Sequence, residues 1–201
     1  MGRQDRRVEE RPDAGQAAAI NEGALRGSAP FVAWLNSDDV YLQGGLLCLL
    51  DALERHPDAP AAYGQVWNTD RALRRLHRIS TEPFSRSRLA RRCIISQPGT
   101  LIRRSAWTGV QGADAGLSMS MDYDLWWRLS ERYGPFVYVA TDVAVNRDHE
   151  DTKTNTRRRQ HYKESMSVVR AYYGRVPLRW YAAWPVSVLW RSFANRWKRR
   201  A

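Results

Sequence analysis

The sequence has few cysteines, few lysines and no long hydrophobic run. Its two cysteines, Cys48 and Cys93, lie far apart and do not have the spacing of metal ligands, so we expect neither a disulfide framework nor a zinc site. A reducing, cytoplasmic location follows from this cysteine usage. The first residues are charged rather than apolar and do not show the pattern of a secretory signal.

Acidic residues are in the minority: 21 Asp and Glu stand against 32 Lys and Arg, which gives a formal net charge of +11. This excess favours an anionic partner, such as nucleic acid, an acidic membrane surface or a phosphorylated substrate. We expect no nucleic-acid partner, because the sequence contains no recognisable nucleic-acid-binding module and its arginines do not alternate with stacking aromatics. The length of 201 residues and the hydrophobic content of 43% suit one domain with an appendage.

The strongest local pattern is an apolar run over residues 31–35 that ends at residues 36–39, Asn-Ser-Asp-Asp. The run predicts a strand buried on both faces of a parallel sheet, and ligands of open α/β sheets bind beyond the carboxyl ends of the strands. Adjacent carboxylates repel each other unless a cation joins them, which favours a site for Mg²⁺ or Mn²⁺ with phosphate oxygens. The alternative is that residues 37–39 only turn the chain and cap the next helix.

Three segments together resemble family 2 glycosyltransferases with the GT-A fold: 13–16 (Asp-Ala-Gly-Gln), 19–23 (Ala-Ile-Asn-Glu-Gly) and 34–41 (Trp-Leu-Asn-Ser-Asp-Asp-Val-Tyr). That family uses an acidic motif at a strand end to hold a divalent metal and the diphosphate of a nucleotide-sugar donor. The resemblance implies that Asp39 is a metal ligand and that Asp38 contacts the ribose or sugar of the donor.

The helix predicted over residues 16–26 borders the donor site in the family. The resemblance therefore makes Gln16 and Asn21 candidate donor contacts. The alternative is that both are ordinary surface amides. Ala17, Ile20 and Leu25 are expected to face the sheet from this helix.

A second acidic pattern lies in residues 120–129, Ser-Met-Asp-Tyr-Asp-Leu-Trp-Trp-Arg-Leu. Ser118 or Ser120 can cap a helix whose first turn carries Asp122 and Asp124, so structure alone accounts for both acids. The resemblance implies more, because inverting GT-A enzymes place an acidic residue at the start of such a helix, facing the acceptor hydroxyl. Asp122 is then the general base that accepts the hydroxyl proton, and Asp124 is a mainly structural residue on the acceptor side.

Two further segments match the family. A Gln-Pro-Gly turn at residues 97–99 precedes an apolar strand and a basic pair, which makes Gln97 a candidate acceptor contact, although turn geometry alone explains the Pro and Gly. Residues 147–154 contain Arg-x-His followed by Thr-Lys-Thr. By resemblance His149 completes the metal site and Lys153 holds the leaving diphosphate, whereas a lone histidine in a polar loop is more often simply exposed.

We expect three parts: a disordered basic arm (1–12), a partial GT-A domain (13–154) and C-terminal helices (155–201). The partial domain is predicted to be α/β, with a Rossmann-like, mostly parallel sheet flanked by helices. The family's nucleobase-binding strand and loop, which precede residue 13, have no counterpart here. The strand over residues 31–35 would then form an open sheet edge, which favours self-association.

The tail, residues 175–201, carries Trp180, Trp184, Trp190 and Trp197 among basic residues, and its apolar part is too short to span a bilayer. Tryptophan flanked by basic charge suits the headgroup region of a membrane, so we interpret the tail as a peripheral contact with the inner face of the cytoplasmic membrane. A helix docked on the domain and a self-association surface are the alternatives.

Taken together, the motifs predict an inverting glycosyltransferase that moves a sugar from a nucleotide-sugar to a hydroxyl of a cell-envelope glycan or a lipid-linked acceptor. The alternative is a catalytically inactive remnant that binds a glycan, a membrane or a partner. This alternative is motivated by the family's nucleotide-binding half, for which the sequence shows no counterpart.

Overall fold

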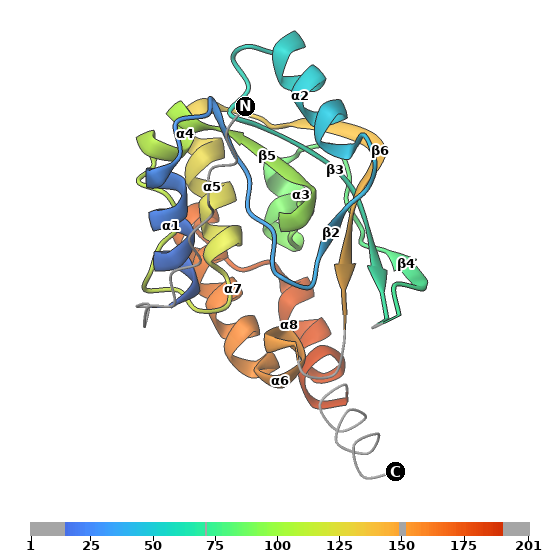
Figure 1. Ribbon diagram of the computed structural model, residues 1–201. Helices are drawn as coiled ribbons and strands as arrows, with labels where there is room; N and C mark the ends of the chain where they lie inside the picture. The colour runs from blue at the N-terminus through green and yellow to red at the C-terminus, as the bar shows by residue number, and fades with distance from the viewer. Residues whose placement is uncertain (1–14, 71, 149–151, 191–201) are drawn as a thin grey trace.

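The computed structural model describes residues 15–70, 72–148 and 152–190, which form a mixed α/β fold around one six-stranded sheet (Figure 1). The strands are β1 (Phe31–Val32), β2 (Val40–Tyr41), β3 (Ala61–Thr69), β4 (Arg75–Arg78), β5 (Thr100–Arg103) and β6 (Val137–Arg147). The helices are α1 (Gln16–Arg26), α2 (Gly45–Arg55), α3 (Arg86–Arg91), η1 (Gln97–Gly99), α4 (Arg104–Gly109), α5 (Met121–Tyr133), α6 (Lys153–Thr156), α7 (Arg158–Tyr173), α8 (Leu178–Trp184) and η2 (Pro185–Trp190).

The sheet has the strand order β1-β5-β3-β6-β2, and β4 pairs with the far end of β3. Among the described strands, β3 and β6 form the one parallel pair, and the other pairings are antiparallel. The α/β class is as predicted, but the expectation of a mostly parallel sheet is wrong. The connections account for two of the pairings: helices lie between β3 and β6 and allow a parallel crossover, whereas a short loop joins β3 to β4 and allows only antiparallel pairing.

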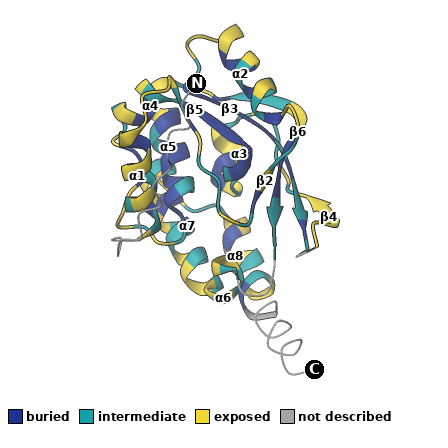
Figure 2. Cartoon of the chain, in the orientation of Figure 1, coloured by how far each residue is buried: buried dark blue, intermediate teal, exposed yellow. Residues whose placement is uncertain are grey.

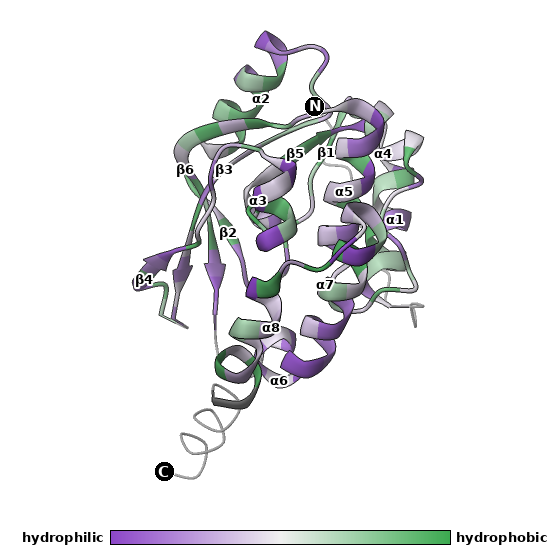
Figure 3. Ribbon diagram, turned by 180° about the vertical axis from the view of Figure 1, so that it is seen from behind, coloured by the Kyte–Doolittle hydropathy of each residue, from purple (hydrophilic) through white to green (hydrophobic). Residues whose placement is uncertain are grey.

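Both faces of the sheet are covered by helices. Helix α2 lies on one face, and α1, α4, α5 and α7 lie on the other (Figure 1). Successive side chains of a strand point to opposite faces, so Tyr63 of β3 packs in the cluster around α5, while Ala62 and Val66 pack against α2. Burial is accordingly concentrated on the surfaces of helices and strands that face each other (Figure 2), whereas β4 and α6 are strongly hydrophilic (Figure 3).

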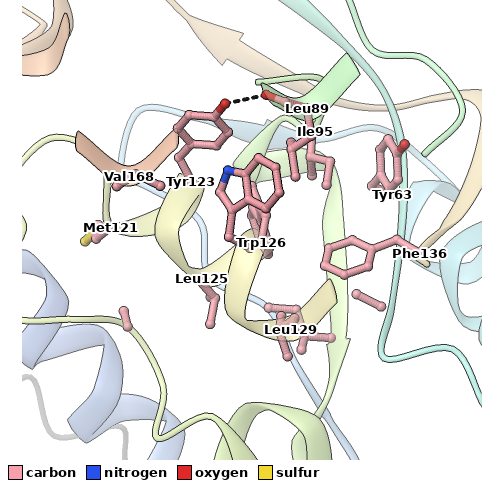
Figure 4. Close-up of a cluster of buried hydrophobic side chains, with 14 of the residues drawn as sticks. Tyr63, Leu89, Ile95, Met121, Tyr123, Leu125, Trp126, Leu129, Phe136 and Val168 are labelled. Atoms are coloured by element: carbon pink, nitrogen blue, oxygen red, sulfur yellow. Dashed lines mark hydrogen bonds between the residues drawn. The ribbon is translucent and has the colours of Figure 1, made fainter. Parts of the chain in front are cut away.

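Helix α5 is the centre of the larger core. Trp126 is fully buried, with its ring stacked on Trp34 at 6.0 Å and edge-on to Phe136 at 5.9 Å between centroids. The hydroxyl of Tyr123 donates a hydrogen bond to the carbonyl of Leu89 in α3 (Figure 4). These contacts fix the orientation of α5, and therefore of the acidic first turn that it carries.

The C-terminal helices belong to the same core. Val168 and Val169 of α7 and Trp180 of α8 are buried in the cluster around α5, and the indole N–H of Trp180 donates to the Ala90 carbonyl at 2.7 Å. The core therefore continues across the boundary predicted at residue 155, and Trp180 adopts the docked alternative. Within the described part of the chain, no helix has the length and apolar character to cross a membrane.

Several local predictions need correction. The first of the C-terminal helices expected from residue 155 is divided at Arg157 into α6, which begins earlier at Lys153, and α7. Leu25 is 80% exposed, because α1 packs through its small residues Ala17 and Ala24 instead. The strand predicted over residues 31–35 is reduced to the two residues of β1, since the chain then leaves the sheet and places Trp34 among the core aromatics.

Candidate active site

A cavity of about 560 Å³ opens between the loop after β1, the end of β6, the start of α5 and the start of α6. It brings together residues that are far apart in the sequence. The predicted site residues that line it are Gln16, Asp38, Asp39, Gln97, Asp122 and Lys153. The two acidic patterns of the sequence, after β1 and at the start of α5, thus face one shared cavity.

Asn36 is the centre of a hydrogen-bond network in this cavity. Its amide nitrogen donates to Asp39 Oδ2 at 2.9 Å, and its amide oxygen accepts from Gln16 Nε2 at 3.0 Å. The amide nitrogen also reaches Gln97 Oε1 at 3.4 Å, and Lys153 Nζ donates to Gln16 Oε1 at 3.2 Å. Sequence reasoning did not assign a role to Asn36, although its position as the first polar residue after the apolar run was a signal.

Asp39 is buried, with 6% of its surface exposed. Burial raises the pKa of Asp39, and the neighbouring Asp38 raises it further, while hydrogen bonds from the Arg147 N–H (3.0 Å) and from Asn36 lower it. Each carboxylate oxygen accepts one hydrogen bond and keeps a lone pair for another ligand. A cation at this position would favour the ionised carboxylate that burial disfavours.

In the described part of the chain, no cluster of three or more His, Cys, Asp or Glu residues could by itself hold a metal ion. The cavity does bring Asp38 and Asp148 to the same space as Asp39. This donor set fits a hard cation that takes one or two carboxylates and completes its shell with phosphate oxygens and water. His149, the second predicted metal ligand, lies outside the described residues.

Asp122 is half-buried at the start of α5, where its Oδ1 accepts the N–H of Tyr123 at 2.8 Å. Burial raises the pKa of Asp122, and this effect is opposed by that hydrogen bond and by the nearby His161. A carboxylate with a raised pKa that faces a cavity is suited to accept a proton.

Several buried donors around the cavity have no hydrogen-bond partner among the described residues. They are the indole N–H of Trp34, Nε of Arg147 and the hydroxyl of Thr152. Buried polar groups are normally satisfied, so these three donors are exceptions among the groups around the cavity. The positive charges of Arg147 and Lys153, which line the cavity, favour an anionic ligand.

Two predicted site residues do not line the cavity. Asn21 instead hydrogen-bonds both backbone groups of Ala113, at 2.7 and 2.8 Å, and so ties α1 to the loop before α5. Asp124 accepts from Arg128 Nε at 2.6 Å and from the Tyr172 hydroxyl at 2.8 Å, which ties α5 to α7. The structure therefore gives both side chains contacts that tie elements together, and Asn21 is not an ordinary surface amide.

The comparisons with solved structures define the class of fold. The chain is similar to S. aureus TarS 1-349 in complex with UDP-GlcNAc, with a TM-score of 0.59, 10% identity, and coverage of 91% of this chain and 60% of that one. It is also similar to S. aureus TarS 1-349 in complex with UDP, with a TM-score of 0.56, 11% identity, and coverage of 79% and 45%. The chain thus has a GT-A-like α/β fold and spans about half the length of the structures it matches.

The family assignment comes from the sequence. The family model "Glycosyl transferase family 2" matches residues 3–110, which is more than half of the chain. The chain therefore belongs to glycosyl transferase family 2, as the motifs predicted. No curated protein sequence matches it at a significant level.

Proposed function

We propose that this protein is an inverting glycosyltransferase that moves a sugar from a nucleotide-sugar donor to a hydroxyl acceptor. The observation that carries the proposal is that Asp39 and Asp122, from two distant acidic patterns, line one cavity together with Lys153. The positive charges of Arg147 and Lys153 at that cavity support an anionic ligand. Membership of family 2 and the UDP-sugar in the TarS complex support a nucleotide-sugar as that ligand.

In the proposed reaction the acceptor oxygen attacks the anomeric carbon of the sugar. A carbon–oxygen bond forms there as the bond to the nucleoside diphosphate breaks on the opposite face, which inverts the configuration. The carboxylate of Asp122 accepts the proton of the acceptor hydroxyl. Lys153 contacts the diphosphate, where negative charge grows in the transition state.

Asp39 would hold a divalent metal, Mg²⁺ or Mn²⁺, with Asp38 placed toward the ribose or sugar and His149 as a further ligand. When bound, such an ion supplies positive charge to the diphosphate leaving group. Asn36 supports the site by orienting Asp39, Gln16 and Gln97 through its amide. Gln97 lies at the cavity wall, where its amide nitrogen donates to the Trp34 carbonyl and keeps a second N–H that could contact the acceptor.

The test is release of nucleoside diphosphate from UDP-GlcNAc and UDP-glucose, with Mg²⁺, Mn²⁺ or a chelator. We expect metal-dependent release by the parent and loss of release in Asp39→Ala and Asp122→Ala. Asp142→Asn is the matched control, because this acidic residue pairs with Arg78 away from the cavity. Release by both alanine variants at the parental rate would contradict the site assignment.

The second candidate function is a binding module without turnover. Such a module would use the same cavity and its Lys153 to bind the anionic ligand but would not need Asp122 as a base. Calorimetry together with the release assay separates the two proposals: a binding module binds UDP-GlcNAc but releases no UDP, whereas the enzyme does both.

We also propose that the acceptor is a cell-envelope glycan or a lipid-linked sugar, met at the inner face of the cytoplasmic membrane through the tail. Trp180 is buried, but Leu178, Tyr181 and Val186 are 83%, 50% and 60% exposed, near the basic Arg179. Sedimentation with vesicles of phosphatidylcholine, with and without phosphatidylglycerol, tests this contact. We expect binding to the anionic vesicles and its loss when the three exposed apolar residues are replaced by serine.

A further inference from the structure

The residues just before α5 are held by a side chain that the proposed reaction does not use. Glu164 of α7 accepts the backbone N–H of Met119 at 2.8 Å and that of Ser120 at 3.2 Å through Oε2. Its Oε1 accepts the hydroxyl of Ser118 at 3.1 Å and the amide of Gln160 at 3.0 Å. One carboxylate thus binds three consecutive residues that lie directly before the first turn of α5.

This carboxylate does for α5 what residues of the helix itself usually do. In a capping box, the N-cap hydroxyl bonds the N–H of the third helical residue, and an acidic side chain at that third position bonds back to the N-cap N–H. In α5 the third residue is Tyr123, which carries no carboxylate, and the N-cap Ser120 directs its hydroxyl to Ser165 at 2.9 Å. Glu164 supplies the missing acceptor from a different helix.

The segment that Glu164 holds is also a wall of the cavity. Ser118 and Met119 line the cavity together with Asp122, which follows two residues after the N-cap. We propose that Glu164 is a positioning residue: by anchoring residues 118–120 to α7, it fixes where the Asp122 carboxylate points. This inference rests on the proposed function for the role of Asp122, but the anchoring can be measured without turnover.

The charged and titratable groups around Asp122 determine which variants of Glu164 can separate positioning of Asp122 from an effect of charge. They are His161 from α7, Cys93 from the loop before η1, and the neighbouring Tyr123. Glu164 also acts on His161, whose pKa burial lowers and whose charged form Asp122 and Glu164 favour. Glu164→Ala removes the charge and the hydrogen bonds, whereas Glu164→Gln removes the charge but keeps one oxygen that can accept from a backbone N–H.

The first experiment follows amide hydrogen exchange in the full chain by NMR. We expect the amides of Met119 and Ser120 to exchange about tenfold faster in Glu164→Ala, with a smaller increase in Glu164→Gln. The matched control is Glu131→Ala, since Glu131 is an exposed glutamate near the end of α5 that pairs with Arg86. Parental exchange of both amides in a folded Glu164→Ala variant would overturn the proposal.

The second experiment titrates the Asp122 carboxyl carbon by NMR. If residues 118–120 loosen, Asp122 becomes more exposed to water, and its pKa, which burial raises, falls toward 3.8 in Glu164→Ala. Glu164→Gln should lower this pKa less, which separates positioning from the loss of charge. An equal change in both variants would show a charge effect and would contradict positioning.

The third experiment measures UDP release from UDP-GlcNAc, with water as the acceptor. We expect kcat to fall about 100-fold in Glu164→Ala with little change in the KM for the donor, and to recover in part in Glu164→Gln. If the parent releases no UDP, the proposed function fails. The amide exchange and the titration of Asp122 still test whether Glu164 anchors residues 118–120. If Glu164→Ala does not fold, parental exchange and parental kcat in Glu164→Gln would overturn the proposal.

Discussion

Asp122 and Asp124 lie two positions apart in the first turn of α5, yet their surroundings differ. Asp122 lines the cavity, whereas Asp124 is buried against Arg128 and Tyr172. The helix places neighbouring side chains on different faces, so one carboxylate meets the ligand space and the other meets the core. Sequence spacing alone could not separate the two roles, because both acids suit the start of a helix.

Replacing each of these aspartates by asparagine should affect a different property: Asp122→Asn the activity, and Asp124→Asn the stability. We expect Asp122→Asn to lower UDP release by about 10²–10⁴-fold with an intact fold, because the variant cannot accept the proton. Asp124→Asn should lower the free energy of unfolding by about 3 kcal/mol, because it leaves Arg128 without its charged partner. Denaturant unfolding and UDP release, measured on both variants, check this pair; a stable Asp124→Asn variant without activity would reverse the assignment.

The raised pKa of Asp122 predicts a pH dependence of both activity and stability. The base works only when ionised, so kcat/KM should fall as the pH drops through a pKa above 3.8.

For stability, the protonated form of Asp122 is favoured in the folded state. The contribution of Asp122 to the free energy of unfolding is therefore full below pH 3.8 and is lost as pH rises through the folded-state pKa. Thermal unfolding of the parent and Asp122→Asn should therefore agree at low pH, with the variant more stable at neutral pH. A constant difference across this range would contradict the raised pKa.

The elements show which part of the fold the sequence determines locally. The bounds of α1 were predicted correctly, since the helical period and the chain-breaking Gly27 lie within or next to the element. The extent of β1 was not predicted correctly. The chain leaves the sheet after Val32 and places Trp34 in an aromatic cluster with Trp107 and Trp126, whose rings are distant in the sequence. The role of Asn36 was missed for the same reason: two of its three partners, Gln16 in α1 and Gln97 in η1, are distant in the sequence.

Helix α8 should depend on one side chain for its docking. Trp180 is buried between α5 and α7, where its ring packs against Tyr162 at 5.1 Å and its N–H bonds the Ala90 carbonyl. Trp180→Ala should lower the free energy of unfolding by about 3–5 kcal/mol. Tyr181→Ala, on the exposed side of the same helix, is the control and should change stability little. Equal stability of the two variants in urea unfolding would show that α8 is not part of the core.

At the scale of the whole molecule, the sheet formed by the described residues ends in two short strands. Strand β1 pairs with β5 and stands at one end of the strand order, and β2 stands at the other. The GT-A-like fold and the family were both predictable from motif order, but the termination of the sheet depends on which strands pair. An edge strand presents backbone groups to any further strand, which favours association between chains.

The isolated 201-residue chain should therefore self-associate through β1. We expect light scattering after size-exclusion chromatography to show dimers or larger species that increase with protein concentration. Ala33→Lys places a charge on the exposed residue after β1 and should restore the monomer, because edge lysines oppose strand pairing. Val40→Lys makes the same change on β2 at the opposite edge, where Val40 is 38% exposed, and should leave association unchanged if β1 is the contact.

A parent chain that stays monomeric across the concentration series would contradict the prediction. Equal relief by both lysine variants would indicate a general effect of charge on solubility rather than pairing at β1.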